Sequence, residues 1–255
     1  MSMPIPVPSA LILAGSRPGA PDPVAQAEGV AHKALVLVDG APLLTRVHAA
    51  LRAAGVERVA VAADAPEVVA LAERLGAEVI PPESGPSGSV ARAFSHLGAP
   101  MLVTTADHAL LQPEWVRQFI EDSPVDADVA LLLARRDAVE RAVPETRRTW
   151  LRFADGQWSG CNLFLLASPD ARHAIATWRD VEANRKKPWR IAAKLGPRVL
   201  WDYLRGTLTL GEAVARLGRR IGIRAAMVPA RDGLAAVDVD KVADLALVRS
   251  VAARR

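Results

Sequence analysis

The stretch Ser9-Ala10-Leu11-Ile12-Leu13-Ala14-Gly15-Ser16-Arg17-Pro18-Gly19 is a short apolar run that ends in a turn of small residues. Its glycines allow positive φ angles and the close approach of a ligand, and the exposed N–H groups of such a turn can bind an anion. Arg17 and, further along the chain, Lys33 add positive charge. This pattern predicts a buried strand over residues 9–14, followed by a loop that wraps the phosphates of a nucleotide.

Two familiar phosphate-binding motifs are absent from this loop. No Lys-Ser or Lys-Thr pair follows the glycines, which excludes a P-loop, and the spaced G-x-G-x-x-G of a dinucleotide-binding fold is missing as well. A glycine-rich turn after a buried strand is often only a turn, and its basic residues are then solvated surface charges. The loop by itself leaves both interpretations open.

Strand-like and helix-like patterns alternate over the first 150 residues. After the first strand we expect strands at 58–62, 78–80, 101–105 and 127–134, and helices at 42–54, 66–75, 89–97 and 113–121. Asp64 to Glu67 is read as a capping box for the second of these helices, and Ser89 as a cap for the third. Near-continuous apolar strands that alternate with helices predict an α/β fold with a mainly parallel sheet covered on both faces.

The second half of the chain is less regular. Strands at 150–153 and 161–167 flank a hairpin turn at Asp155-Gly156-Gln157, and a helix follows Ser168-Pro169-Asp170. Thr209-Leu210-Gly211-Glu212 predicts a capped helix start. Strands near 223–228 and 235–239 and a helix over 241–251 close the chain.

Composition places the chain among ordinary globular proteins. It has 255 residues, 51% of them hydrophobic, and no apolar run reaches the ~18 residues of a membrane span. The N-terminal residues 1–8 hold three prolines and no basic residue, which does not fit a secretion signal. The single Cys161 excludes an internal disulfide and is expected to be a small buried residue. We therefore expect a cytoplasmic protein.

Positive charge is concentrated between residues 185 and 224. Eleven Lys and Arg stand there against Asp202 and Glu212, whereas the net charge of the whole chain is only +4. We expect a single domain over residues 1–255 that carries this segment as a basic helical insertion over 180–222. Such a segment favours an anionic partner, and a solvated helical surface is the alternative.

Aromatic residues are interleaved with these charges. Trp189, Trp201 and Tyr203 could stack on nucleic-acid bases, but they stand where a helix would bury them. We therefore expect them to pack against the main sheet and do not expect a nucleic-acid partner.

Carboxylates follow two of the expected strands. Asp107 comes after the strand at 101–105, and Asp240 ends the strand at 235–239. Ligands of open α/β sheets bind beyond the carboxyl ends of the strands, and Mg²⁺ takes one or two carboxylates together with substrate phosphates. The pair predicts a Mg²⁺ site, unless Asp107 is a turn residue and Asp240 a helix cap. His108 is either a further ligand or base, or a neutral loop residue.

Two other stretches are candidates for substrate contacts. The loop around Gly88 and Ser89 consists of small residues, which let backbone groups approach a nucleotide base. Helix capping without any ligand explains this composition equally well. Gly160 and Asn162, at the start of a strand, offer a backbone approach and an amide for an acceptor hydroxyl, and a strand bulge is the alternative.

Six short motifs taken together resemble those of one family. They are Leu13-Ala14-Gly15-x-Arg17, then Lys33-Ala34-Leu35 with Gly40-Ala41-Pro42-Leu43-Leu44, then Ser87-Gly88-Ser89-Val90, Asp107, Gly160-x-Asn162, and Val239-Asp240-Lys241-Val242-Ala243-Asp244-Leu245. In this order they resemble the MobA-like nucleotidyltransferases. The resemblance covers nearly the whole chain except the basic segment. The stretch between Arg17 and Lys33 is longer here than is usual in that family.

This resemblance implies a three-layer, Rossmann-like nucleotidyltransferase fold and a role for each matching residue. It implies catalytic roles for Arg17 and Lys33 on the triphosphate, nucleotide binding by Ala14, Gly15, Ser16, Gly88 and Ser89, acceptor binding by Gly160 and Asn162, and Mg²⁺ at Asp107 and Asp240. The implied reaction is an in-line attack of an acceptor phosphate on the α-phosphorus of an NTP, with release of pyrophosphate. Positioning and charge neutralisation drive such a reaction.

Two other functions fit the same pattern. Asp238-Val239-Asp240 has the form of a D-x-D motif, which would hold a nucleotide-sugar in a glycosyltransferase. A protein that binds nucleotides without catalysis would also keep this fold, and the lengthened first loop favours that alternative. We expect an Mg²⁺-dependent nucleotidyltransferase with a phosphorylated small-molecule or lipid-like acceptor; the identity of the base and of the acceptor stay open.

Overall fold

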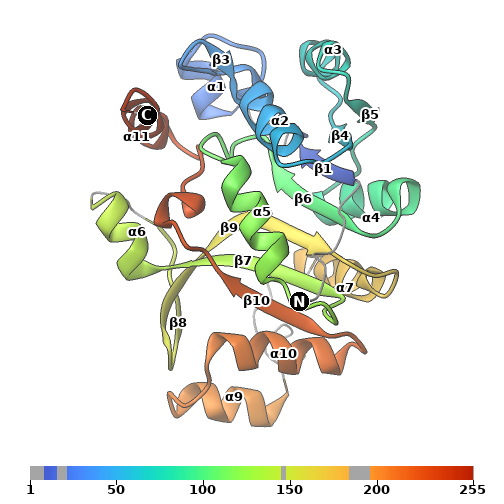
Figure 1. The fold of residues 1–255 in the computed structure, drawn as a ribbon, viewed down its shortest axis with the longest axis vertical. Coiled ribbons are helices and arrows are strands. Elements are labelled where there is room, and N and C mark those ends of the chain that lie inside the picture. Colours follow the sequence, from blue (N-terminus) through green and yellow to red (C-terminus); the bar gives the residue numbers. More distant parts are fainter. Residues whose placement is uncertain (1–8, 16–21, 145–147, 184–195, 255) are drawn as a thin grey trace.

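The computed structural model describes residues 9–15, 22–144, 148–183 and 196–254 (Figure 1). Its strands are β1 Ser9–Leu13, β2 Leu37–Val38, β3 Ala41–Pro42, β4 Arg58–Ala62, β5 Glu78–Ile80, β6 Met101–Thr105, β7 Val129–Arg135, β8 Leu151–Phe153, β9 Gly156–Leu166 and β10 Ala225–Pro229. Its helices are α1 Pro23–Ala27, α2 Leu43–Ala53, α3 Pro66–Arg74, α4 Pro86–Leu97, α5 Pro113–Asp122, α6 Arg136–Ala142, α7 Ala171–Ala183, α9 Pro197–Leu204, α10 Leu210–Arg220 and α11 Val242–Ala252, with 3₁₀ turns η1 Lys33–Leu35 and η2 Gly233–Ala236.

One mixed sheet crosses the molecule. Seven of its strands lie in the order β10-β7-β9-β6-β1-β4-β5, and β8 pairs with β9 as the eighth. β1 runs parallel to both β4 and β6, whereas β9 is antiparallel to its neighbours β6, β7 and β8. The expected α/β fold with a mainly parallel sheet is confirmed.

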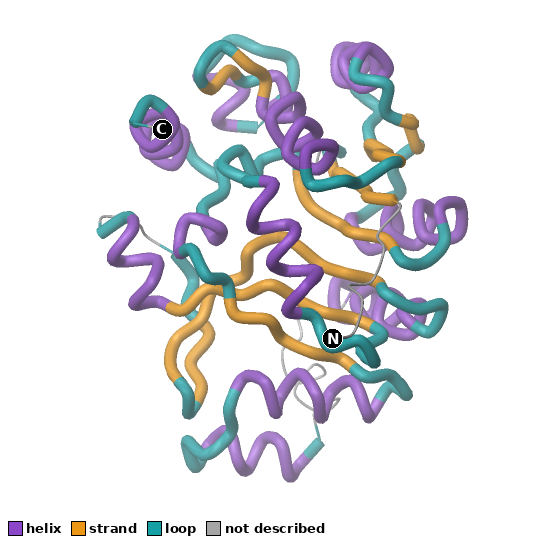
Figure 2. Tube along the Cα trace, in the orientation of Figure 1, coloured by secondary structure: helices purple, strands orange, loops and turns teal. Residues whose placement is uncertain are grey.

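Helices cover both faces of this sheet, as Figures 1 and 2 show. α2, α3, α5 and α11 pack on one face, where the larger hydrophobic core lies. α4 and α7 pack on the other face over a second core, and α10 covers the β7–β10 end of the sheet. Among the described residues, no helix is long and apolar enough to cross a membrane.

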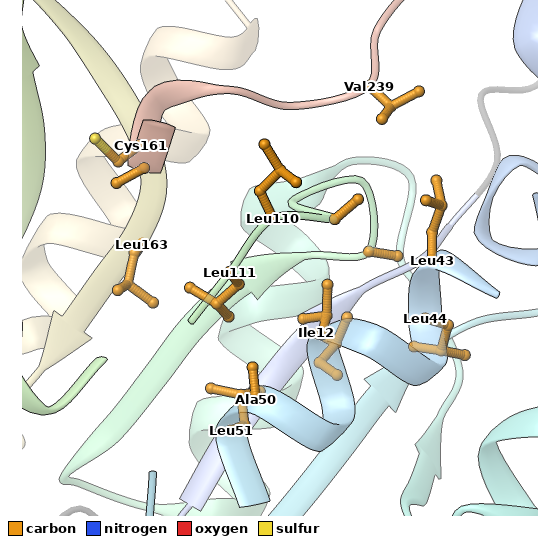
Figure 3. Close-up of a cluster of buried hydrophobic side chains, with 14 of the residues drawn as sticks. Ile12, Leu43, Leu44, Ala50, Leu51, Leu110, Leu111, Cys161, Leu163 and Val239 are labelled. Carbon is orange, nitrogen blue, oxygen red and sulfur yellow. The ribbon is translucent and has the colours of Figure 1, made fainter. Parts of the chain in front are cut away.

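The strand expected over 235–239 is wrong. This stretch begins in η2 and then runs extended with Val237 and Val239 buried, and Val239 N donates to the carbonyl of Asp107 at 3.0 Å. Figure 3 shows Val239 in one buried cluster with Leu110 and Leu43. We call residues 237–240 the C-terminal strap. The strap joins no ladder because a single turn of 3₁₀ helix leads into it, yet burial of its valines holds it in place.

Several element boundaries differ from the expected ones. Ala65 caps α3 without a side-chain hydrogen bond, so the capping box at Asp64 is wrong. α4 begins at Pro86, and Ser89 lies within its first turns rather than capping it. The box formed by Thr209 and Glu212 is confirmed at the start of α10. α1 and α6 were not expected because both are short and lack a clear hydrophobic period.

The expected burial of the aromatic residues in the basic segment is wrong for Trp201 and Tyr203. Trp201 is 61% exposed and Tyr203 is 45% exposed, although the Tyr203 ring touches Phe153 edge to face. α9 lies outside α10 and away from the main sheet (Figure 1), so its aromatic side does not reach the core. Trp189 and the rest of 184–195 lie outside the described residues. By contrast, Cys161 is buried as expected (Figure 3).

Gly233 provides a test of how the C-terminal strap is anchored. A Cβ added there would overlap the backbone of Ala138 and Val139 in α6. We therefore expect Gly233→Ala to lower the free energy of unfolding by about 1–3 kcal/mol, the usual cost of overpacking. Urea denaturation measures this value. Gly211→Ala is the matched control: nothing lies within 4 Å of its added Cβ, so inside α10 it should raise stability slightly. Equal stability of both variants would contradict the anchoring role of Gly233.

Candidate active site

The order of the strands reverses at β1. The chain passes from β1 to β4 and β5 on one side, and returns to β6 on the other side of β1. Ligands of open α/β sheets bind at such a reversal, beyond the carboxyl ends of the strands. Ala14 and Gly15 leave β1 at this point, where Ala14 N donates to Ala62 O at 3.0 Å, and Asp107 follows β6.

Lys33 lies at the centre of this region. It is the first residue of η1, whose start is held by the His32 ring, because Nδ1 accepts a hydrogen bond from Ala34 N at 3.0 Å. The Lys33 ammonium donates to Asp107 Oδ2 at 2.7 Å. It also lies 3.8 Å from Asp240 Oδ1 and 3.9 Å from Asp22 Oδ2. Three carboxylates from distant parts of the chain thus surround one cation.

The charges of this cluster are strongly coupled. Burial disfavours the ammonium of Lys33, but Asp107, Asp240 and Asp22 outweigh that effect and raise the pKa of Lys33. Burial raises the pKa of Asp240, and the negative charges of Asp238 and Asp107 raise it further. The site therefore holds more negative charge than Lys33 alone offsets, and it would bind a further cation favourably.

Asp107 is held in place from three directions. Its Oδ1 accepts a hydrogen bond from Thr105 Oγ1, its Oδ2 accepts one from Lys33, and its carbonyl accepts one from Val239 N. Its side chain is only 15% exposed. The C-terminal strap thereby places Asp240 beside Asp107, although Asp240 follows an extended segment and not a strand of the sheet. Asp240 is not the cap of α11, because that position belongs to Lys241.

The donor set fits Mg²⁺ better than a softer metal. Among the described residues no group of three or more His, Cys, Asp or Glu side chains has the arrangement of a complete metal site. Asp107 and Asp240 instead lie 2.7 Å and 3.8 Å from the ammonium of Lys33. Mg²⁺ takes one or two protein carboxylates and completes its shell with water and substrate phosphates. Asp107 and Asp240 offer only carboxylate oxygens, which agrees with that preference.

His108 does not belong to this cluster. Its side chain is buried and stacks near Trp115, with ring centroids 6.4 Å apart. Burial lowers the pKa of His108 to about 4, so the ring is neutral at physiological pH. Because the ring is enclosed beside Trp115 and joins no described group that could hold a metal ion, the structure supports the second interpretation, a neutral residue.

The glycines near β1 and α4 serve different purposes. A Cβ at Gly15 would meet only Pro82 Cβ, at an ordinary 3.5 Å, so packing inside the protein does not require glycine there. A Cβ at Gly88 would lie 2.7 Å from Glu83 Cβ, so close packing requires that glycine. Ser89 Oγ accepts from Glu83 N and donates to Gly85 O. Gly88 and Ser89 thus shape the loop that lies against Gly15.

Asn162 lies at a bulge of β9. The register between β7 and β9 shifts between Leu131 and Leu133, and Asn162 has a left-handed φ of 48°. Its Nδ2 donates to Asp238 Oδ2 at 2.7 Å, and Arg148 Nη2 donates to the other oxygen of Asp238. The strand bulge, which was the alternative to an acceptor-binding role, is therefore present, and the Asn162 amide contacts Asp238 within the protein. Gly160 is exposed two residues earlier.

The Arg148–Asp238 pair was not predicted from the sequence. The side chains of both residues are nearly buried, at 12% and 13% exposure. Burial raises the pKa of Asp238, the adjacent Arg148 opposes the rise, and Asp107 adds to it. Arg148 belongs to no recognisable motif and lies 90 residues before its partner. Only the adjacent Arg147-Arg148 in a polar loop could have drawn attention to it.

The remaining predicted residues cannot be placed. Ser16 and Arg17 lie in 16–21, outside the described residues. The structure therefore brings together Lys33, Asp107 and Asp240, and places Asn162 beside the C-terminal strap through Asp238.

The chain is similar to one protein family and to several solved structures. The family model of the MobA-like NTP transferase domain matches residues 10–199. A hypothetical transferase from Thermus thermophilus is 33% identical, with a TM-score of 0.80, and the match covers 94% of this chain and 99% of that one. Comparison with curated protein sequences gave no significant match.

Two more distant structures share the fold. CMP:2-keto-3-deoxy-manno-octonic acid synthetase complexed with CTP is 21% identical, with a TM-score of 0.54 over 96% of this chain and 99% of that one. The 2-C-methyl-D-erythritol 4-phosphate cytidylyltransferase from Thermus thermophilus is 18% identical, with a TM-score of 0.52 over 97% and 99% of the two chains.

The resemblance drawn from the six sequence motifs is thereby confirmed. The family model spans most of the chain, and its matched region includes Gly15, Lys33, Asp107 and Asn162. This protein belongs to the MobA-like nucleotidyltransferase family.

Proposed function

We propose that this enzyme transfers a nucleoside monophosphate from an NTP to a phosphorylated acceptor, with Mg²⁺ as its cofactor and pyrophosphate as the second product. One observation carries the proposal: Lys33 lies between the carboxylates of Asp107 and Asp240 at the strand-order reversal. A cation and two carboxylates at this edge match the charge of a Mg²⁺–triphosphate substrate.

Lys33 has two successive roles in this proposal. Without nucleotide its ammonium neutralises Asp107 and Asp240. When the triphosphate enters, Lys33 turns to the phosphates and stabilises the negative charge that builds on them as the bond to the leaving pyrophosphate breaks. Asp107 and Asp240 would hold Mg²⁺, which would supply positive charge for the phosphate oxygens. The bare backbone at Gly15 gives the phosphates room beside β1.

Asn162 orients the acceptor. Because the Asp238 carboxylate accepts the Nδ2 hydrogen bond, the amide of Asn162 is fixed, and no described residue donates to its Oδ1. That oxygen is an acceptor, so it suits a hydroxyl group of the acceptor molecule. Arg148 completes the arrangement by balancing the charge of Asp238. The acceptor phosphate then attacks the α-phosphorus in line, and positioning supplies much of the rate.

The glycosyltransferase alternative gains no support from this geometry. A D-x-D motif would need the carboxylates of both Asp238 and Asp240 for one nucleotide-sugar and its metal ion. Both oxygens of Asp238 are already bonded, one to Arg148 and one to Asn162. Breaking a buried ion pair is costly, so Asp238 serves the site as a support.

Asp107→Asn tests the proposed function directly. It removes a negative charge beside Lys33 and weakens the proposed cation site, so we expect turnover to fall by about two orders of magnitude or more. Pyrophosphate release, screened over the four NTPs and a panel of phosphorylated acceptors, measures it. Circular dichroism should show an intact fold.

Asp39→Asn is the matched control for that variant. Asp39 is an exposed carboxylate in the tight turn between β2 and β3, where Asn tolerates the φ of 51°. The control should keep full activity. Unchanged turnover in Asp107→Asn would contradict the proposed role of Asp107.

Lys33→Met separates the two roles of Lys33. Without the ammonium, Asp107 and Asp240 repel each other and no tethered cation competes for them. We expect Mn²⁺, used as a probe for Mg²⁺, to bind the nucleotide-free variant about tenfold more tightly than it binds the wild-type protein. Electron paramagnetic resonance of free Mn²⁺ gives the affinity. Weaker or equal Mn²⁺ binding would contradict competition between Lys33 and the metal.

Asn162→Gly tests the acceptor side. Glycine keeps the left-handed backbone at this bulge and removes only the amide. Loss of one hydrogen bond to the acceptor predicts a rise of about tenfold in the KM for the acceptor, with the KM for the NTP unchanged. Steady-state kinetics with each substrate varied in turn distinguish the two constants. A rise confined to the KM of the NTP would move Asn162 to the nucleotide side.

A further inference from the structure

The side chains of α9 are distributed unusually, with apolar residues facing solvent and a charged residue facing the protein. Its inner side carries Asp202, which forms an ion pair with Arg216 of α10, and both side chains are less than a third exposed. Its outer side carries Leu200, Trp201 and Leu204, which are 39%, 61% and 72% exposed. An ordinary surface helix turns its apolar side to the protein and its polar side to water, so the pattern of α9 is reversed.

This concentration of apolar side chains is unusual for the molecule. The large hydrophobic residues that are exposed among the described residues are Leu37, Val125, Leu151, Leu200, Trp201, Tyr203, Leu204 and Val242. Half of this set lies on the eight-residue α9. Single exposed apolar residues need no explanation, but a contiguous group marks an interaction surface. We call Leu200, Trp201, Tyr203 and Leu204 the α9 surface.

Positive charge surrounds the α9 surface. Arg198 and Arg205 are exposed on and directly after the helix, and the Arg205 guanidinium lies 5.9 Å from the centre of the Trp201 ring. Arg219 and Arg220 are exposed at the end of α10, and Arg220 lies next to Gly196 at the start of α9.

We propose that the α9 surface docks the protein on an anionic lipid membrane, as a peripheral contact that does not span it. Trp and Tyr favour the boundary between lipid headgroups and acyl chains, where leucines insert and arginines pair with anionic headgroups. This inference does not depend on the proposed function, because it uses no residue of the candidate active site.

Two other occupants fit the α9 surface less well. A second copy of the chain would bring the same arginines together across a two-fold axis, where like charges repel each other. A single-stranded nucleic acid would match the charge and could stack on Trp201 and Tyr203, but it would give the exposed Leu200 and Leu204 no apolar partner.

Vesicle sedimentation without any nucleotide tests the proposal. We expect the wild-type protein to bind phosphatidylcholine vesicles that contain about 30% phosphatidylglycerol, to bind pure phosphatidylcholine vesicles far more weakly, and to dissociate as salt rises. Trp201→Ser/Leu204→Ser should weaken binding at least tenfold. Both side chains are mostly exposed, so circular dichroism and the thermal midpoint should stay unchanged.

Matched variants make the result specific. Leu37→Ser/Val125→Ser removes comparably exposed apolar residues from other parts of the surface and should bind like the wild type. Arg198→Gln/Arg205→Gln should weaken binding to the anionic vesicles. Failure of the wild-type protein to bind anionic vesicles at low salt would overturn the proposal. So would equal binding by Trp201→Ser/Leu204→Ser, or a wild-type dimer in light scattering that this variant abolishes.

Discussion

The parallel pairing of β1 with both β4 and β6 is the constraint on which the rest of this structure depends. Parallel strands end at a common edge, and the chain must leave β1 toward one neighbour and return to the other. Lys33, Asp107 and the C-terminal strap all meet at that edge because the sheet topology brings their backbones there.

The C-terminal strap shows how a distant segment completes the site. One backbone hydrogen bond, from Val239 N to Asp107 O, places Asp238 and Asp240 near Asp107 and Lys33. Burial of Val239 between α2 and the loop after β6 holds it there (Figure 3). The result is a concentration of negative charge that is costly unless a cation offsets it. Lys33 provides that charge within the protein, and the substrate complex of the proposed reaction would bring its own.

The negative charge of Asp238 is offset in a different way, by Arg148 instead of Lys33. It is more deeply buried than Asp240 and is paired permanently with Arg148 and Asn162. A buried pair of this kind adds little net stability, but it fixes the orientation of the groups that it joins. Adjacent carboxylates of one short motif therefore have different tasks: Asp238 supports Asn162, and Asp240 faces Lys33.

The amino-acid sequence by itself determined the strands β4, β5 and β6, which lie where they were predicted, and with them the class of fold. β4 and β6 are buried along most of their length, so their apolar runs are strong signals, and the six ordered motifs identified the family. The tertiary structure alone decided that residues 237–240 form a strap, that Arg148 pairs with Asp238, and that Trp201 faces outward. Each of these depends on contacts between residues far apart in the chain, or on which side of a helix packs against the protein. Local sequence patterns do not specify either.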